Sequence, residues 1–492
     1  MSPTLLFSIV VAYFALLLAV AWVTSRGANN HSFFIGNKNS NWMLVAFGMI
    51  GTSLSGVTFI SVPGAVGATA FTYFQIVLGQ LVGYFVIAFV LLPIFYKLNL
   101  TSIYDYLGIR LGPHSRKTGA SFFILSRTLG ATARVYLVIR ILQDAILDSL
   151  GVPFWLTAAV IIMMVLLYTY EGGVKTIVWT DTLQTSCMLL GLVISVVYLL
   201  NGLNISVGEA LTQMETRGLS HIFSTDVDRK EFWLKQILAG MFIAIAMTGM
   251  DQEMMQKNIS VKRLTDSQKN IVTLAIIMVC VVLLFLFLGG LLYLYAPTVG
   301  VTATGDKIFP AVVLGHLPAM LQIIFVIALI SALFPSADGA ITALTSSFCI
   351  DILSMQKRND WSEADRKRIR HRVHLGFAGI FLLLIMMFKW ADNPSMIGLI
   401  LKLAAFTYGP LLGLFAFGIL SKREVNDSLA PWIAITAPII CYAIDVNQSV
   451  LFGSYQIGLE LLIVNGAITY FGLWATSKHT IVAQHEIGRA HV

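Results

Sequence analysis

Apolar runs of about 20 residues recur from one end of this chain to the other, and they limit what it can fold into. Each run is long enough to cross the hydrocarbon core of a bilayer as a helix. Only 12% of the 492 residues are charged, against roughly 25% in soluble domains. We predict an all-α polytopic membrane protein with about thirteen spans, near residues 3–24, 43–68, 72–96, 118–149, 153–170, 179–202, 231–254, 270–296, 318–352, 372–390, 395–420, 428–446 and 451–475.

The distribution of Lys and Arg predicts the orientation of these spans. With the N-terminus outside, alternate loops and the C-terminal tail lie in the cytoplasm, and most basic residues then fall on that side, as the positive-inside rule requires. The densest basic cluster, residues 357–372, is interpreted as a topology anchor, with lipid-headgroup binding as the alternative. This placement of charge does not indicate nucleic-acid binding. The first span lacks the features of a cleaved signal, so we expect it to be retained.

The sequence gives no indication of a motif for covalent catalysis. The four cysteines all fall in apolar spans without CxxC spacing, which indicates packing residues. HExxH, GxSxG and P-loop patterns are absent from the sequence. An enzyme is therefore not favoured.

One hydroxyl- and glycine-rich stretch interrupts the second span, "GTSLSGVTFISVPGAVG" at 51–67. Glycines and Pro63 weaken a helix there, and loosened backbone at membrane depth survives only beside other protein or a wet cavity. We predict a break around Gly51–Gly56 whose carbonyls can coordinate a cation, with Ser55 and Thr58 on a common face. A small-residue packing seam is the alternative interpretation.

Two carboxylates fall inside or at the edge of apolar spans. Asp181 is either a helix N-terminal acid at the interface or a buried acid facing a cation route. Asp338 lies deep in the span at 318–352, where an isolated carboxylate needs a cation, a proton or a partner. Pro335, in the same span, removes one N–H and frees the carbonyl of Ser331.

Three arginines lie in the span near 118–149. Arg127 and Arg134 are seven residues apart and share a helix face, whereas Arg140 lies about 120° away. We expect Arg127 to snorkel to the cytoplasmic interface and Arg140 to pair with Asp144. Arg134 is nearest the middle of the span, where its guanidinium suits a carboxylate or phosphate, with internal ion pairing as the alternative. Lys402 lies near the outer end of its span and is expected to snorkel.

Taken together, the sequence resembles the sodium:solute symporter family across nearly its whole length. The resemblance rests on five stretches in order: "YTYEGGVKTIVWTDTLQ" (168–184), "GMDQEMMQKNISVKRLTDSQKN" (249–270), "DKIFPAVVLGHLP" (306–318), "SALFPSADGAITALTSSFCIDI" (331–352) and "YGPLLGLFAFGIL" (408–420). It implies the leucine-transporter-type fold, with two inverted five-helix repeats whose first helices are broken near 51–64 and 246–252. The implied division is 1–42 (extra helix and loop), 43–202 (first repeat), 203–230 (extracellular loop), 231–420 (second repeat), 421–476 (two trailing helices) and 477–492 (cytoplasmic tail).

The resemblance also implies a sodium site. Its ligands are the carbonyls of Gly51, Leu54 and Ala332 and the hydroxyl of Ser336, all hard oxygen donors that suit an alkali cation. Pro335 stands where the family usually has a hydroxyl residue. One ligand is therefore lost there, unless a carbonyl or water replaces it.

A second ion is a further hypothesis from the resemblance. Asp181 matches the acid that holds a second sodium in some relatives. Asp338 and Gly339, however, stand at the matching serine positions.

Substrate contacts are implied at Ser55, Thr58, Gln75 and Arg134, and the first-helix motif is closest to the sialic acid branch.

These features predict a sodium-coupled secondary active symporter. It would import a small organic solute by alternating access, and the expected solute bears a carboxylate, such as a sialic acid-like sugar acid. A neutral sugar or another small metabolite is the alternative solute, and an ion channel or a proton-coupled transporter is the alternative class. We expect sodium ions, the solute and membrane lipid as partners, no nucleic acid, and a functional monomer. The expected location is the plasma membrane, specifically a bacterial inner membrane.

Overall fold

The computed structural model describes residues 3–24, 41–358, 360–391 and 396–478. Within these ranges the regular elements are all helical. The α-helices are α1 (Pro3–Thr24), α3 (Trp42–Ser53), α4 (Gly56–Thr69), α5 (Tyr73–Val86), α6 (Leu92–Lys97), α7 (Asp105–Arg110), α8 (Pro113–Leu142), α9 (Phe154–Leu203), α10 (Val207–Thr216), α11 (Trp233–Ala244), α12 (Gln252–Ile259), α13 (Leu264–Tyr295), α14 (Ile308–His316), α15 (Ala319–Ser347), α16 (Glu363–Ala391), α17 (Met396–Thr407), α18 (Gly409–Leu420), α19 (Ala430–Val446), α20 (Gln448–Phe452) and α21 (Leu461–Thr476).

The predicted spans correspond to helical segments in the described residues. Seven helices are long and apolar enough to cross a membrane, three bent helix pairs pass the same test, and three shorter apolar helices complete the set. The predicted spans 153–170 and 179–202 lie in one helix, α9, whose 50 residues exceed a single crossing at about 1.5 Å per residue. Its apolar parts, Phe154–Leu167 and Ile177–Leu203, match the two spans. The last span starts later than predicted, because Gly453 (φ 64°) ends α20 before α21 begins.

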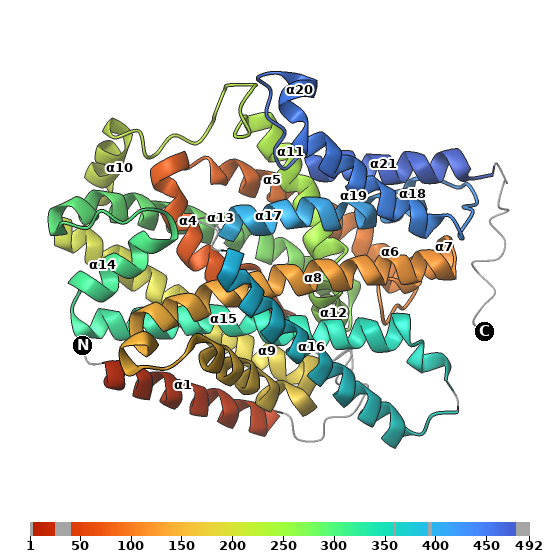
Figure 1. Ribbon diagram of the computed structural model, residues 1–492, viewed down its shortest axis with the longest axis horizontal. Helices are drawn as coiled ribbons and strands as arrows, with labels where there is room; N and C mark the ends of the chain where they lie inside the picture. Colours follow the sequence, from red (N-terminus) through yellow and green to blue (C-terminus); the bar gives the residue numbers. More distant parts are fainter. Residues whose placement is uncertain (1–2, 25–40, 359, 392–395, 479–492) are drawn as a thin grey trace.

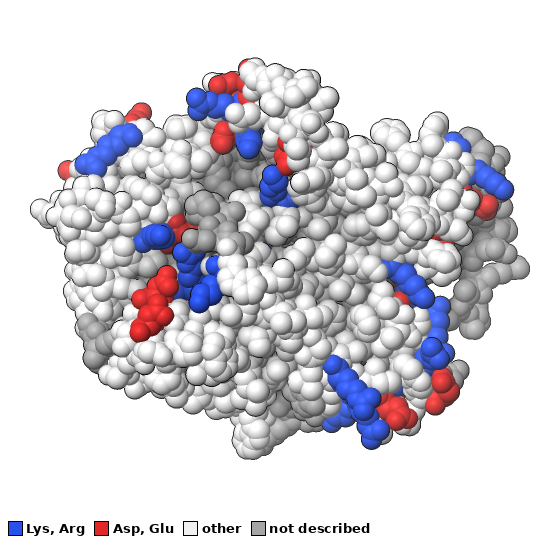
Figure 2. All heavy atoms as spheres, viewed as in Figure 1, with Lys and Arg blue, Asp and Glu red and all other residues white. Residues whose placement is uncertain are grey.

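The helices form a bundle with one dominant direction (Figure 1). In this view α8 and α15 run across the middle and α1 follows the lower edge. Helix α1 begins at the left end and α21 ends at the right end, on opposite sides of the bundle. Charged side chains gather toward the two ends and the upper rim, with broad uncharged surface between them (Figure 2). This distribution matches a bundle whose middle faces hydrocarbon.

Three breaks in helices lie inside the bundle. The axis bends by 54° between α3 and α4, by 64° between Trp233–Gly249 and α12, and by 45° between α17 and α18. The first two breaks were predicted, and the third was not. The residues at the breaks, Leu54, Met250 and Tyr408, are all buried. The interrupted backbone is therefore enclosed by protein, as it must be at membrane depth.

A glycine seam joins α5 to α11, which belong to different halves of the chain. A Cβ at Gly79 would lie 2.0 Å from the carbonyl oxygen of Ile237, and one at Gly240 would lie 2.1 Å from that of Ile76. Only glycine allows the two backbones to approach so closely. This contact fixes the bent helix that starts with α11 against the first half of the chain.

Candidate ion and substrate site

The break between α3 and α4 frees backbone oxygens. Leu54 (φ −90°, ψ 81°) and Ser55 (φ −80°, ψ 175°) both leave the helical conformation. The N–H of Leu54 still donates to the carbonyl of Ile50 (2.7 Å), and helical bonding resumes where Phe59 donates to Ser55 (3.0 Å). Within the described chain, no backbone N–H donates to the carbonyls of Gly51 or Leu54. These two oxygens therefore keep their lone pairs for another partner.

Helix α15 presents further oxygens to this break. The hydroxyl of Ser336 is 1% exposed and has no hydrogen-bond partner among the described residues. A Cβ at Gly56 would lie 3.8 Å from the carbonyl oxygen of Ala332, which places that carbonyl beside the break. Helix α15 continues through Pro335, which has no N–H, so the carbonyl of Ser331 loses its helical donor.

The donor set fits an alkali cation. The predicted ligands Gly51, Leu54, Ala332 and Ser336 supply only oxygen atoms. One of these is a buried hydroxyl without a hydrogen-bond partner in the described part of the chain. Hard oxygen donors without nitrogen or sulfur are what such a cation prefers. Pro335 has no side-chain oxygen to add, so its contribution is limited to its carbonyl.

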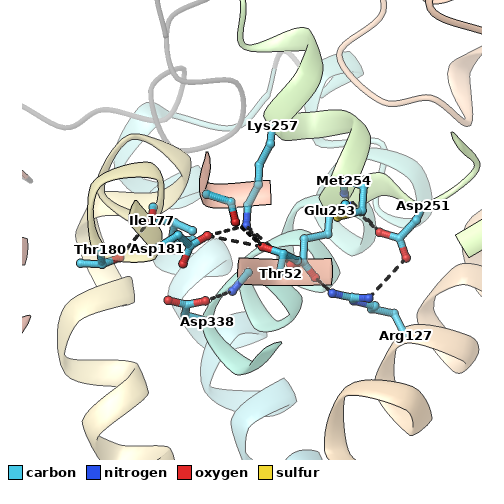
Figure 3. A network of polar contacts seen from close by, with 12 residues as sticks. Thr52, Arg127, Ile177, Thr180, Asp181, Asp251, Glu253, Met254, Lys257 and Asp338 are labelled. Carbon is cyan, nitrogen blue, oxygen red and sulfur yellow. Dashed lines mark hydrogen bonds and ion pairs between the residues drawn. The ribbon is translucent and has the colours of Figure 1, made fainter. Parts of the chain in front are cut away.

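A buried lysine occupies the neighbourhood of the candidate second ion (Figure 3). The Nζ of Lys257 donates to Oδ2 of Asp181 at 2.7 Å and to Oγ1 of Thr52 at 2.6 Å. Asp181 is fully buried within α9, so the interpretation of this residue as an acid at the interface is wrong. Asp338 is also fully buried, and its Oδ1 accepts from the N–H of Gly339 at 2.5 Å.

Arg127 lies inside the bundle and contacts two acids. Its guanidinium pairs with Glu253, and its Nη1 is 3.8 Å from Oδ2 of Asp251. The expectation that Arg127 snorkels to the interface is therefore wrong, because the start of α12 supplies two carboxylates within reach. Asp251 also caps α12 by accepting from the N–H groups of Glu253 and Met254 (2.9 and 3.3 Å).

A cavity of about 100 Å³ opens beside the first break. Of the predicted substrate residues, Ser55, Thr58 and Arg134 all line it. Arg134 is half-buried, and in the described part of the chain it makes no hydrogen bond or ion pair. The polar residues of the wall that were not predicted as substrate contacts are Thr52, Ser53, Tyr73, Gln80, Tyr84, Arg127 and Thr248.

Two further cations, Arg140 and Lys402, have acidic partners. Arg140 pairs with Asp144 (Nε–Oδ2, 3.8 Å), as predicted, so Asp144 is not the partner of Arg134. The exposed Lys402 pairs with Asp445 (Nζ–Oδ2, 2.8 Å), a contact that was not predicted.

Gln75 lies outside this cavity wall. Its Nε2 donates to the carbonyls of Thr72 and Glu231, both at 3.1 Å, and its Oε1 accepts from the N–H of Ser224 at 3.4 Å. These contacts connect α5 to the segment before α11. A substrate role for Gln75 stays a prediction, which the geometry does not support. Gln80, five residues further along α5, lines the cavity instead.

The family follows from comparison of the sequence with known proteins. The model of the sodium:solute symporter family matches residues 33–436. The chain belongs to this family. It is 24% identical to the sodium/sialic acid symporter NanT of Aliivibrio fischeri over 95% of this chain and 93% of that protein. It is 26% identical to the human sodium-coupled monocarboxylate transporter 1 over 79% of this chain and 64% of that protein.

A solved structure confirms the predicted fold. The structure of a substrate-bound, outward-open Na⁺-coupled sialic acid symporter superposes with a TM-score of 0.81 at 18% identity, covering 96% of this chain and 99% of the other. The fold is therefore the leucine-transporter type, with its inverted repeat of five plus five helices. Membership of the sodium:solute symporter family gives sodium as the coupling ion of this multi-pass membrane protein.

Proposed function

We propose that this chain imports a small carboxylate-bearing solute together with sodium by alternating access, with sialic acid-like sugar acids as the leading class. The observation that carries this proposal is Arg134. Its guanidinium lies in the cavity wall without a hydrogen bond or ion pair in the described residues, whereas Arg127 on the same helix face already contacts two acids. A half-buried arginine fork of this kind suits a carboxylate, which it binds through paired, charge-assisted hydrogen bonds.

The sodium site adjoins the proposed solute site. The cavity includes Ser53 and Ser55, which flank Leu54, one of the candidate sodium ligands. A cation at the break would therefore also order the backbone that carries Ser55 and Thr58. Each ligand would then strengthen the binding of the other, and this reciprocity is what coupling requires.

A smaller monocarboxylate is the second candidate solute. The cavity is only about 100 Å³ in this structure, which favours a compact acid. The similarity to a monocarboxylate transporter also supports a small monocarboxylate as the solute. The similarity to NanT supports the sugar acid instead. Both solutes carry the carboxylate that Arg134 requires, whereas a neutral sugar does not.

A thermal-shift screen of the purified protein tests the proposal. The protein is heated with N-acetylneuraminate, with lactate and with glucose, each in NaCl and in choline chloride. A ligand that binds only the folded state raises its apparent stability, so we expect an acid to raise the melting temperature in sodium and to do so weakly in choline. Stabilisation by glucose alone, or by an acid equally in both salts, would contradict the proposal.

The remaining assignments follow the sequence. We place the protein in a bacterial inner membrane as a monomer among lipids, with the N-terminus outside and the C-terminus in the cytoplasm, and without nucleic-acid binding or enzymatic activity. The two repeats are proposed at 43–202 and 231–420. Labelling of single cysteines from each side of the membrane tests this orientation.

A further inference from the structure

Lys257 is a buried primary amine that the family resemblance did not single out. It extends from α12 towards α3 and α9 (Figure 3) and is 2% exposed. Its Nζ lies 2.6 Å from Oγ1 of Thr52, 2.7 Å from Oδ2 of Asp181 and 3.8 Å from Oε1 of Glu253. One cationic nitrogen is therefore surrounded by oxygens from three separate elements.

An ammonium group and a sodium ion are bound by similar ligands in such a site. Both carry one positive charge, and both are held by hydroxyl and carboxylate oxygens. Two cations sharing Oδ2 of Asp181 would repel each other strongly in a buried site. Oδ2 of Asp181 is therefore already occupied by the ammonium, whereas Oδ1 makes no hydrogen bond among the described residues. A sodium ion at Oδ1 would still lie close to the buried charge of Lys257.

A glycine at a neighbouring position makes room for this arrangement. A Cβ at Gly339 would lie 2.2 Å from Oε1 of Glu253, so any side chain there would displace that carboxylate. Glu253 precedes Lys257 by one helical turn and lies within ion-pair distance of it. Asp338 also acts electrostatically on the ammonium. The absence of a side chain at Gly339 thus leaves the space in which the carboxylate of Glu253 reaches Lys257.

We propose that the ammonium of Lys257 takes the place of a second sodium ion at Asp181, so that this chain binds a single sodium ion, at the break between α3 and α4. The inference rests on the proposed sodium symport and goes beyond it by setting the ion stoichiometry. Because Lys257 is part of the chain, its charge returns with the protein after each cycle. One positive charge fewer then enters the cell per solute than in a transporter with two sodium ions.

Binding of ²²Na⁺ to the purified protein tests this directly. We expect the unaltered protein to bind about one ion per chain with a Hill coefficient of about 1. Lys257→Met removes the ammonium but retains a long apolar side chain, and it should raise binding to about two ions with a Hill coefficient above 1. Lys257→Arg keeps the charge and should stay at about one ion. Lys402→Met, at an exposed lysine paired with Asp445, is the matched control.

The outcomes separate the two proposals. Absence of saturable sodium binding to the unaltered protein would remove the symport proposal and this inference with it. Two ions bound to the unaltered protein would overturn the inference and leave the symport proposal intact. A folded Lys257→Met variant that binds one ion would also overturn it. If that variant does not fold in any salt, the stoichiometry of the unaltered protein decides alone, with one ion supporting the inference.

Discussion

The hydroxyl of Tyr408 donates to Oδ2 of Asp251 at 2.7 Å, across 157 residues of sequence. Each residue lies at a helix break: Tyr408 lies between α17 and α18, and Asp251 lies between the π-helical turn Ile245–Gly249 and α12. Asp251 also faces Arg127 and caps α12. One carboxylate thus links two broken helices to α8.

This link predicts a stability loss for Tyr408→Phe. The substitution leaves Asp251 with one hydrogen bond fewer in a buried site, and hydrogen bonds to charged groups contribute about 1.5–3 kcal/mol. We expect a lower melting temperature in a thermal-shift assay. Tyr442→Phe is the control, because Tyr442 is 63% exposed. Equal melting temperatures for the two variants would mean that the link contributes nothing.

Ser336→Ala should weaken the response to sodium. It removes one of few oxygens at the proposed ion site, and we expect roughly a tenfold higher sodium concentration at half-maximal uptake, equivalent to about 1.4 kcal/mol. Uptake into proteoliposomes across a sodium series measures this. Ser186→Ala removes an exposed hydroxyl on α9 that donates to the carbonyl of Thr182, and it should leave the response unchanged. An unchanged sodium dependence for Ser336→Ala would contradict the assignment of Ser336 to the sodium site.

Asp181→Asn should destabilise the protein and reduce transport. It leaves the ammonium of Lys257 without its partner at 2.7 Å, and removing one member of a buried ion pair costs about 3–5 kcal/mol. The double variant Asp181→Asn/Lys257→Met removes both charges and should recover most of the stability. Melting temperatures of the two single variants and the double variant form the test cycle. Purely additive losses would show that the pair is not coupled.

The glycine seam between α5 and α11 predicts another loss of stability. Gly79→Ala would place a methyl group 2.0 Å from the backbone carbonyl oxygen of Ile237, which cannot move without shifting α11. We expect low yield and early melting. Gly130→Ala, within α8, is the matched control, because a Cβ there meets nothing within 4 Å. It should be neutral or slightly stabilising, because alanine favours a helix by about 1 kcal/mol over glycine.

Hydropathy predicted the helical spans because each span in lipid must form its backbone hydrogen bonds within itself. The apolar pattern that marks a span is therefore contained in a short stretch of sequence. The break at Leu54 and Ser55 was also predictable, because glycines and hydroxyl residues gather there within one span. The break at Tyr408 was missed, although Gly409 and Pro410 follow Tyr408 directly and such a pair commonly interrupts a helix. Its polar partner, Asp251, is distant in sequence.

The charged network was the least predictable part of the site. Glu253 and Lys257 lie at the predicted inner end of a span, where solvated charges are common, and their pairing one helical turn apart was the only local signal. Arg127 was assigned to the interface by the same reasoning. Sequence position gives the depth of a residue along the membrane, but it does not tell which helices surround it. Only the fold brings α8, α9 and α12 together around these charges.

The last prediction concerns Arg134, which lines the cavity without a hydrogen bond or ion pair in the described residues. Arg134→Ala should abolish acid-dependent stabilisation and uptake, because truncating the partner of a desolvated anion costs about 2–5 kcal/mol, or roughly 30- to several-thousand-fold in affinity. Sodium binding and the melting temperature without solute should change little. Arg134→Lys should recover little, because a point charge cannot reproduce the bidentate fork.

Arg140→Ala is the matched control for this arginine. It lies six residues further along, in the last turn of α8, and contacts Asp144. We expect it to keep most acid binding. If Arg134 instead supports the fold, its alanine variant will melt early in every salt and with every solute. Tight binding of a neutral sugar, equal for the unaltered protein and for Arg134→Ala, would exclude a carboxylate-bearing solute. Arg134 is the one cation of the cavity wall without an acidic partner in the described residues, and it would then have no role in recognising the solute.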